Sequence, residues 1–231
     1  MGKLLLGKYV KELINAILAG ILLTLGTIAY VFCYANSFRI LGAIIFSSMF
    51  ILISLYGYSL VTDKMGYTLE NKPIFLFDVI VSFLGNFIGT FVISWLISLT
   101  RFFDKGFSNY VSTYNDALSF IVLDKVEDGR LSLLVLGFLC GIMCYLTINT
   151  YKKAEQPIAK YLLVFMSVSL FVFVGLEHSV MDMALINLYA LTNKFANYGT
   201  LIIKLIDVSF GNFIGCLFIP TVVFLRRKIR S

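Results

Sequence analysis

The chain has 231 residues, of which 59% are hydrophobic and 16% aromatic, while only 14% are charged. An ordinary soluble domain carries about 25% charged residues, so this composition excludes a soluble globular protein and predicts one that crosses a membrane several times. The net charge of +6 is interpreted as an excess of Lys and Arg on cytoplasmic segments, and not as a nucleic-acid-binding surface.

Six apolar segments are long enough to cross a bilayer, for which a helix needs about 20 residues. The amino-terminal arm, the connections on its side and the carboxyl-terminal tail together hold most of the Lys and Arg residues. Both termini are therefore expected in the cytoplasm, in a multi-pass protein of the inner or plasma membrane. The expected spans are residues 14–34, 40–55, 74–99, 131–148, 158–191 and 201–225.

Two of these spans are interrupted by polar residues. The second span gives way to residues 56–64, which include Gly57, Ser59 and Thr62, and the fifth is interrupted at residues 177–182. Interruptions of this kind are typical of discontinuous membrane helices that line a binding site. Between the third and fourth spans, residues 110–123 have mixed apolar spacing and are expected to lie as an amphipathic segment at the membrane interface.

The fifth-span interruption holds the only histidine, His178, between Glu177 and Asp182. On insertion scales, placing an ionisable residue at the centre of a membrane helix costs about 2.5–3.5 kcal/mol of free energy. Such a residue is therefore by default a functional-site hypothesis. A histidine that is merely hydrogen-bonded in the core is the alternative. Three polar groups that need partners together favour a segment lining a cavity over a helix facing lipid.

The sequence also contains an internal repeat. Residues 85–90 read Gly-Asn-Phe-Ile-Gly-Thr, and residues 211–216 read Gly-Asn-Phe-Ile-Gly-Cys. The predicted fold is all-α, one transmembrane channel domain over residues 1–231 with repeat halves at about 12–100 and 129–226. Because each half holds three spans, the second should be inverted relative to the first, an aquaporin-like 3+3 arrangement. Asn86 and Asn212 are interpreted as helix-packing or loop-tethering groups.

Several other classes of protein lack support in the sequence. One histidine cannot supply the ligands of a zinc protease, and no G-x-S-x-G motif is present, so the chain is not expected to be an enzyme. The four cysteines form no CxxC pair and are expected to be small buried residues, with no metal or other cofactor. A neutral-solute pore without the paired Asn-Pro-Ala loops of aquaporins, and a non-transporting sensor or scaffold, remain alternatives.

The Glu177-His178-Ser179 motif, the twin Gly-Asn-x-x-Gly motifs and the Leu60-Val61-Thr62 interruption together resemble the formate/nitrite transporter family of small-anion channels. The resemblance covers nearly the whole chain. It implies a homopentamer in the lipid bilayer, with one aquaporin-like pore through each protomer. It also implies that spans two and five break at the pore centre between two apolar constrictions.

The resemblance also implies roles for individual residues. His178 matches the central pore histidine, Thr62 the threonine beside it, and Lys125 the outer lysine ahead of span four, for which Arg130 is the alternative. Glu177 is expected to fix the loop by hydrogen bonding. The residues that match the constrictions are Phe46, Phe50, Leu60, Val61 and Phe171.

A small monovalent anion must shed water in an apolar slit, and a central hydrogen-bond donor lowers that cost. Thr62 and His178 could replace the lost water, and Lys125 would raise the anion concentration at the mouth. Formate, nitrite and hydrosulfide all suit such a pore, crossing either as the anion or as the neutral acid. Three departures from the family pattern, namely the Leu60-Val61-Thr62 loop, Met181-Asp182 and Gly141 in place of an Asn, favour hydrosulfide slightly.

Overall fold

A computed structural model describes residues 2–100, 102, 109–193 and 196–229 of the chain. Within these ranges the protein is built from helices, and no residue is in a strand. This confirms the all-α prediction. The helices are α1 Gly2–Ala35, α2 Arg39–Tyr56, α3 Val61–Met65, the 3₁₀ turn η1 Thr68–Glu70, α4 Phe75–Ser98, α5 Asn109–Glu127, α6 Arg130–Lys153, α7 Pro157–Val174, α8 Ser179–Thr192 and α9 Tyr198–Ile229.

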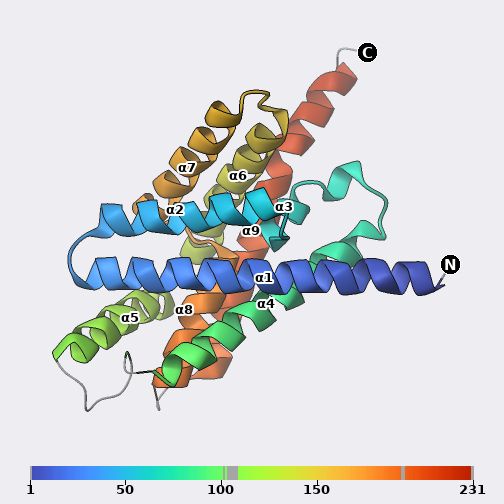
Figure 1. The fold of residues 1–231 in the computed structure, drawn as a ribbon. Helices are drawn as coiled ribbons and strands as arrows, with labels where there is room; N and C mark the ends of the chain where they lie inside the picture. Colours follow the sequence, from blue (N-terminus) through green and yellow to red (C-terminus); the bar gives the residue numbers. More distant parts are fainter. Residues whose placement is uncertain (1, 101, 103–108, 194–195, 230–231) are drawn as a thin grey trace.

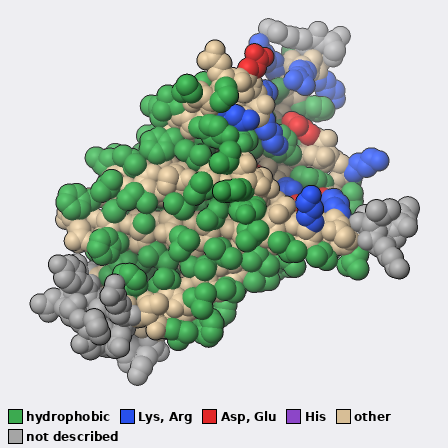
Figure 2. Space-filling model, viewed as in Figure 1, with side chains coloured by type: hydrophobic (Ala, Val, Ile, Leu, Met, Phe, Trp, Pro, Cys, Tyr) green, Lys and Arg blue, Asp and Glu red, His purple; other side chains and the backbone are tan. Residues whose placement is uncertain are grey.

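Six of the described helices are long and apolar enough to cross a membrane, namely α1, α2, α4, α6, α7 and α9. Hydrophobic side chains cover most of the face shown in Figure 2, and Lys and Arg gather toward the end where both termini lie in Figure 1. A surface of this kind faces lipid or other apolar partners, because charged groups avoid the hydrocarbon layer. The chain is therefore a multi-pass membrane protein.

The helices pack in two corresponding sets. α1 packs along α4 and α6 packs along α9, while α2 and α7 lie against each other. Glycines of the repeated motif allow the first two pairs to approach closely: a Cβ on Gly89 would overlap the backbone of α1 at Ile17, and one on Gly215 the backbone of α6 at Phe138. The matching contacts support the internal repeat. That one half is inverted relative to the other remains a prediction.

The long connection between the two halves contains α5, which extends the expected segment 110–123 in both directions. Its buried side chains, among them Tyr114, Leu118 and Val122, belong to the hydrophobic core. The helix contacts α1, α8 and α9, so its apolar face covers the bundle. This packing carries Lys125, near the end of α5, to the second interruption.

Candidate functional site

Two short breaks separate α2 from α3 and α7 from α8, and we call them the first break, residues 57–60, and the second break, residues 175–178. Each begins with a left-handed glycine, Gly57 with φ 68° and Gly175 with φ 87°. The interruptions predicted at residues 56–64 and 177–182 end too late, because helix resumes at Val61 and at Ser179, and the second also begins two residues earlier than predicted. Backbone groups away from water need partners, and a renewed helix supplies them within a few residues.

Asn86 on α4 holds the first break in place. Its Oδ1 accepts the N–H of Val61 at 2.9 Å, and its Nδ2 donates to the carbonyl oxygens of Ser59 at 2.9 Å and Ala16 at 2.8 Å. Asn86 is fully buried. Through one amide, the loop is therefore tied to both α1 and α4.

Asn212 on α9 makes the same three bonds at the second break. Its Oδ1 accepts the N–H of Ser179 at 2.9 Å, and its Nδ2 donates to the carbonyl oxygens of Glu177 at 2.8 Å and Gly137 at 2.9 Å. Three pairs of positions in the two halves correspond through these bonds. They are Ser59 with Glu177, Leu60 with His178, and Lys64 with Asp182.

The first turn of α3, directly after the first break, meets the second break at Thr62 and His178. The Oγ1 of Thr62 and the Nε2 of His178 are 3.4 Å apart, and both residues are 1% exposed. The N–H of Met181 donates to Nδ1 of His178 at 3.4 Å, so the imidazole caps the start of α8. An acceptor at Nδ1 requires the neutral tautomer with its proton on Nε2, which then points as a donor toward Thr62.

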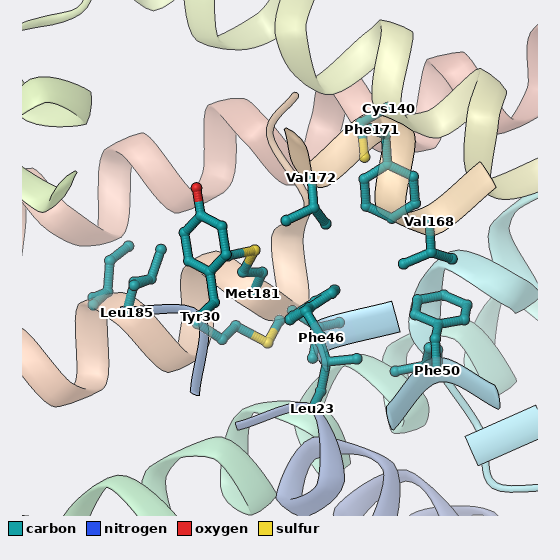
Figure 3. Packing of buried hydrophobic residues seen from close by; sticks show 14 of the residues in the cluster. Leu23, Tyr30, Phe46, Phe50, Cys140, Val168, Phe171, Val172, Met181 and Leu185 are labelled. Atoms are coloured by element: carbon teal, nitrogen blue, oxygen red, sulfur yellow. The ribbon is translucent and has the colours of Figure 1, made fainter. Parts of the chain in front are cut away.

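Aromatic rings enclose this imidazole. The ring of Phe171 stacks on it with centroids 5.7 Å apart, and that of Phe50 meets it edge-on at 6.0 Å. Figure 3 shows Phe50 on α2 near Val168 and Phe171 on α7, and Phe46 beside Leu23. The remaining expected constriction residues, Leu60 and Val61, are fully buried with Phe46. The arrangement closes the site around His178 with apolar groups.

A cavity of about 110 Å³ lies at one end of the site, and we call it the Lys125 cavity. Inside it, Lys125 forms ion pairs with Glu177 and with Oδ1 of Asp182, the latter at 3.1 Å. Burial disfavours the charge of Lys125, but the carboxylates of Asp182 and Glu177 outweigh it and raise the lysine pKa. The cavity is lined by Tyr30, Tyr34, Arg39, Phe120, Ile121, Asp124, Lys125, Val172, Gly175, Leu176, Glu177, Met181, Asp182 and Leu185.

A second cavity of about 370 Å³, the Lys64 cavity, is lined by residues of α2, the first break, α3, α4 and α6, and by Tyr67 and Asn71 on either side of η1. The lining includes Ser54 near the carboxyl end of α2, whereas the lining of the Lys125 cavity includes Arg39 at its amino end. At 1.5 Å per residue these positions are about 22 Å apart, so the cavities open at opposite ends of α2. Lys64 pairs with Glu12 at 2.9 Å in this region.

Arg130, the alternative to Lys125, bonds elsewhere. Its guanidinium forms two hydrogen bonds with Asp207, at 2.8 and 2.9 Å, and its side chain is 73% exposed. Of these two cations, Lys125 alone contacts the second break in the structure.

Two features of the site were not assigned from the sequence. Asp182 shares Lys125 with Glu177, and the thiols of Cys140 and Cys144 lie 3.9 Å apart, fully buried. The spacing of four residues on one helix was a visible signal for the thiol pair. No sequence signal predicted the contact between Asp182 and Lys125, because it forms only when α5 packs against α8 in the folded protein. Among the described residues, no group of three or more His, Cys, Asp or Glu could hold a metal ion.

Comparisons with known proteins agree with this architecture. A family model described as formate/nitrite transporter matches residues 3–226. A solved structure of a pentameric formate channel with formate bound is 20% identical, with a TM-score of 0.78 over 96% of this chain and 98% of that one. An FNT family ion channel is 21% identical, with a TM-score of 0.79 over 94% and 90% of the two chains. A search among curated proteins gave no match.

Proposed function

This chain belongs to the formate/nitrite transporter family, and from that premise we propose that it is a channel for small monovalent anions of weak acids. The membership confirms the family resemblance seen in the sequence and places the chain among transporters rather than enzymes. The proposed cargo comprises formate, nitrite and hydrosulfide. Its path runs from the Lys125 cavity past His178 to the Lys64 cavity.

The observation that carries the proposal is the meeting of Thr62 and His178 inside an apolar enclosure. An anion that leaves water for such an enclosure loses several kcal/mol of hydration unless donors replace the water. The Nε2–H of His178 and the hydroxyl of Thr62 are two such donors, contributed by different halves of the chain. Because His178 is neutral in this arrangement, it can hydrogen-bond an anion without trapping it as a tight ion pair.

The remaining residues divide into two groups. Bulky apolar side chains exclude water and hydrated ions on either side of His178, and they are Phe46, Phe50, Leu60, Val61 and Phe171. Asn86, Asn212 and Glu177 support the breaks. Lys125 supplies positive charge where the anion enters.

The assembly and orientation are part of the same proposal. Apolar side chains remain exposed on all six spanning helices, and one of the similar solved structures is a pentameric formate channel. We infer a homopentamer in which some of this surface is shared between copies and the rest faces lipid. The concentration of Lys and Arg near the termini favours a cytoplasmic location for both ends in the plasma membrane.

Among the three anions, hydrosulfide is slightly favoured by the departures at Gly141, Met181 and Asp182 from the family pattern. A neutral-solute pore and a non-transporting sensor or scaffold are the competing functions. Neither competitor explains why a histidine donor and a lysine lie along one path through the protein.

The proposal is tested by uptake of each anion into proteoliposomes, with empty vesicles as the blank. His178→Ala removes the donor and the cap of α8, whereas His178→Asn keeps a side-chain oxygen that can accept the Met181 N–H. The wild type should pass at least one anion well above the blank, and both variants should alter that rate. If a folded wild type passes none of the three, the channel proposal fails.

A further inference from the structure

Resting on the channel proposal, we propose that Asp182 makes the Lys125 cavity a proton-binding site, and that an anion gains access to Lys125 only when this proton is bound. Asp182 thereby becomes a determinant of anion access that the repeat and the family motif do not explain. The ligand is a proton shared by the carboxyl groups of Asp182 and Glu177.

The charges around Lys125 do not balance. One ammonium faces two carboxylates, those of Glu177 and Asp182, and the side chains of all three residues are less than a fifth exposed. With every group ionised the cluster has a net negative charge, which repels an anion in a low-dielectric cavity. One bound proton makes the cluster neutral.

The carboxyl group of Asp182 has a free oxygen to hold that proton. Its Oδ1 pairs with Lys125, but Oδ2 is buried and has no hydrogen-bond partner within the described residues. Asp182 is only 2% exposed. An ionised oxygen in such a place bears the full cost of lost hydration, whereas a protonated one can donate to Glu177 or to an arriving anion.

Other charged groups around the cluster lie on α2, α5 and α9. Arg39 and Asp124 line the same cavity, and Lys204 on α9 lines a small cavity on the other side of Asp182. Lys204 donates to the backbone carbonyl of Asp128, and the guanidinium of Arg39 lies 5.9 Å from the ring of Tyr34. Tyr30 and Tyr34 are the titratable hydroxyls of α1 in this lining. Arg39 and Asp124 offset each other, so the proton on the cluster decides the charge that the anion meets.

The opposite cavity provides a contrast. Lys64 occupies the position that corresponds to Asp182, and it pairs with the single carboxylate of Glu12. Asp63 and Lys152 also line that cavity, so two lysines stand against two carboxylates and the charges balance without a proton. The proposed site therefore belongs to one mouth of the pore, and anion access at that mouth should depend on the pH of the solution it faces.

Formate uptake at about pH 6 and at about pH 8.5 tests the proposal, because formate is ionised at both values. Wild-type uptake should be about fivefold to tenfold lower at the higher pH, because the one proton shared by Asp182 and Glu177 dissociates and the cluster becomes negatively charged. Asp182→Asn should remove most of this dependence by raising uptake at high pH. Asp124→Asn removes the same charge from the cavity lining, but the ion pairs of Lys125 in the structure are with Glu177 and Asp182, so this variant should keep the wild-type pH profile.

If Asp182→Asn transports formate with an unchanged pH profile, the proton site is wrong and the channel proposal still stands. Should that variant fail to fold, Glu177→Gln removes one carboxylate from the same cluster and must flatten the profile instead. Infrared difference spectra of the protein in membranes give a readout independent of transport. A protonated carboxyl band at about pH 6 that is lost in Asp182→Asn supports the site, and no such band in the wild type overturns it.

Discussion

The two breaks share a backbone and differ in their side chains. Gly57 and Gly175 open them with the same left-handed turn, and Asn86 and Asn212 hold them with the same three hydrogen bonds. The first break then presents Leu60, whereas the second presents His178 at the corresponding position. The two copies of the repeat thus have the same backbone geometry, but one presents an apolar side chain and the other a polar one.

The asparagines should show the largest effects on stability. Asn86→Ala and Asn212→Ala each leave three backbone groups without their side-chain partner, and each unsatisfied buried group costs about 1–3 kcal/mol. We expect each variant to lower the free energy of unfolding in detergent by about 3–5 kcal/mol. Asn187→Ala, which loses one hydrogen bond to Thr90, should cost about 1 kcal/mol. Unequal costs for Asn86 and Asn212 would contradict an equivalent scaffold.

The next largest effects on stability are expected at the glycines between the paired helices. Gly89→Ala pushes a methyl group into the backbone of α1, and Gly215→Ala into that of α6. Overpacking of this kind costs about 1–3 kcal/mol, measurable as a lower thermal midpoint of both variants. Gly7→Ala meets no atom within 4 Å and is the control, expected to change stability little.

The left-handed glycines should have smaller effects. An alanine in this conformation costs about 1–2 kcal/mol through contact of its Cβ with the backbone. Gly175→Ala should cost more than Gly57→Ala, because its Cβ would also lie 3.2 Å from Nη2 of Arg39 while nothing crowds position 57. Thermal unfolding of the two variants side by side measures the difference, and equal costs would show that Arg39 moves aside freely.

A substitution at Thr62 tests the contact between α3 and the second break with a minimal change. Thr62→Val removes one hydrogen-bond donor to the anion. The loss should raise the barrier to anion passage by about 1 kcal/mol, which corresponds to about a fivefold lower anion flux. Thr62→Ser should restore the flux. Thr27→Val removes a buried hydroxyl that bonds only within α1, so its flux should equal that of the wild type. A Thr62→Val channel at full rate would place the hydroxyl outside the conduction path.

Much of the scaffold was predictable because local sequence patterns determine it. The Gly-Asn-x-x-Gly motifs and the apolar runs indicated six spans and a repeat, and α1, α6 and α9 differ from prediction mainly in extending beyond the membrane-length runs. The ends of the breaks were misplaced because Thr62 and Asp182 are polar yet helical. Their side chains contact tertiary partners, His178 and Lys125 respectively, which no local pattern reveals.

The central claim is that the two breaks act together on one anion. Its most direct test is a double-mutant cycle on anion flux with Thr62→Val, His178→Asn and the two combined. If both donors hold the same anion, the fold loss of flux in the double variant, relative to the wild type, should be clearly less than the product of the two single losses. Effects that simply multiply would contradict a shared site, and would mean that Thr62 and His178 touch without serving the same ion.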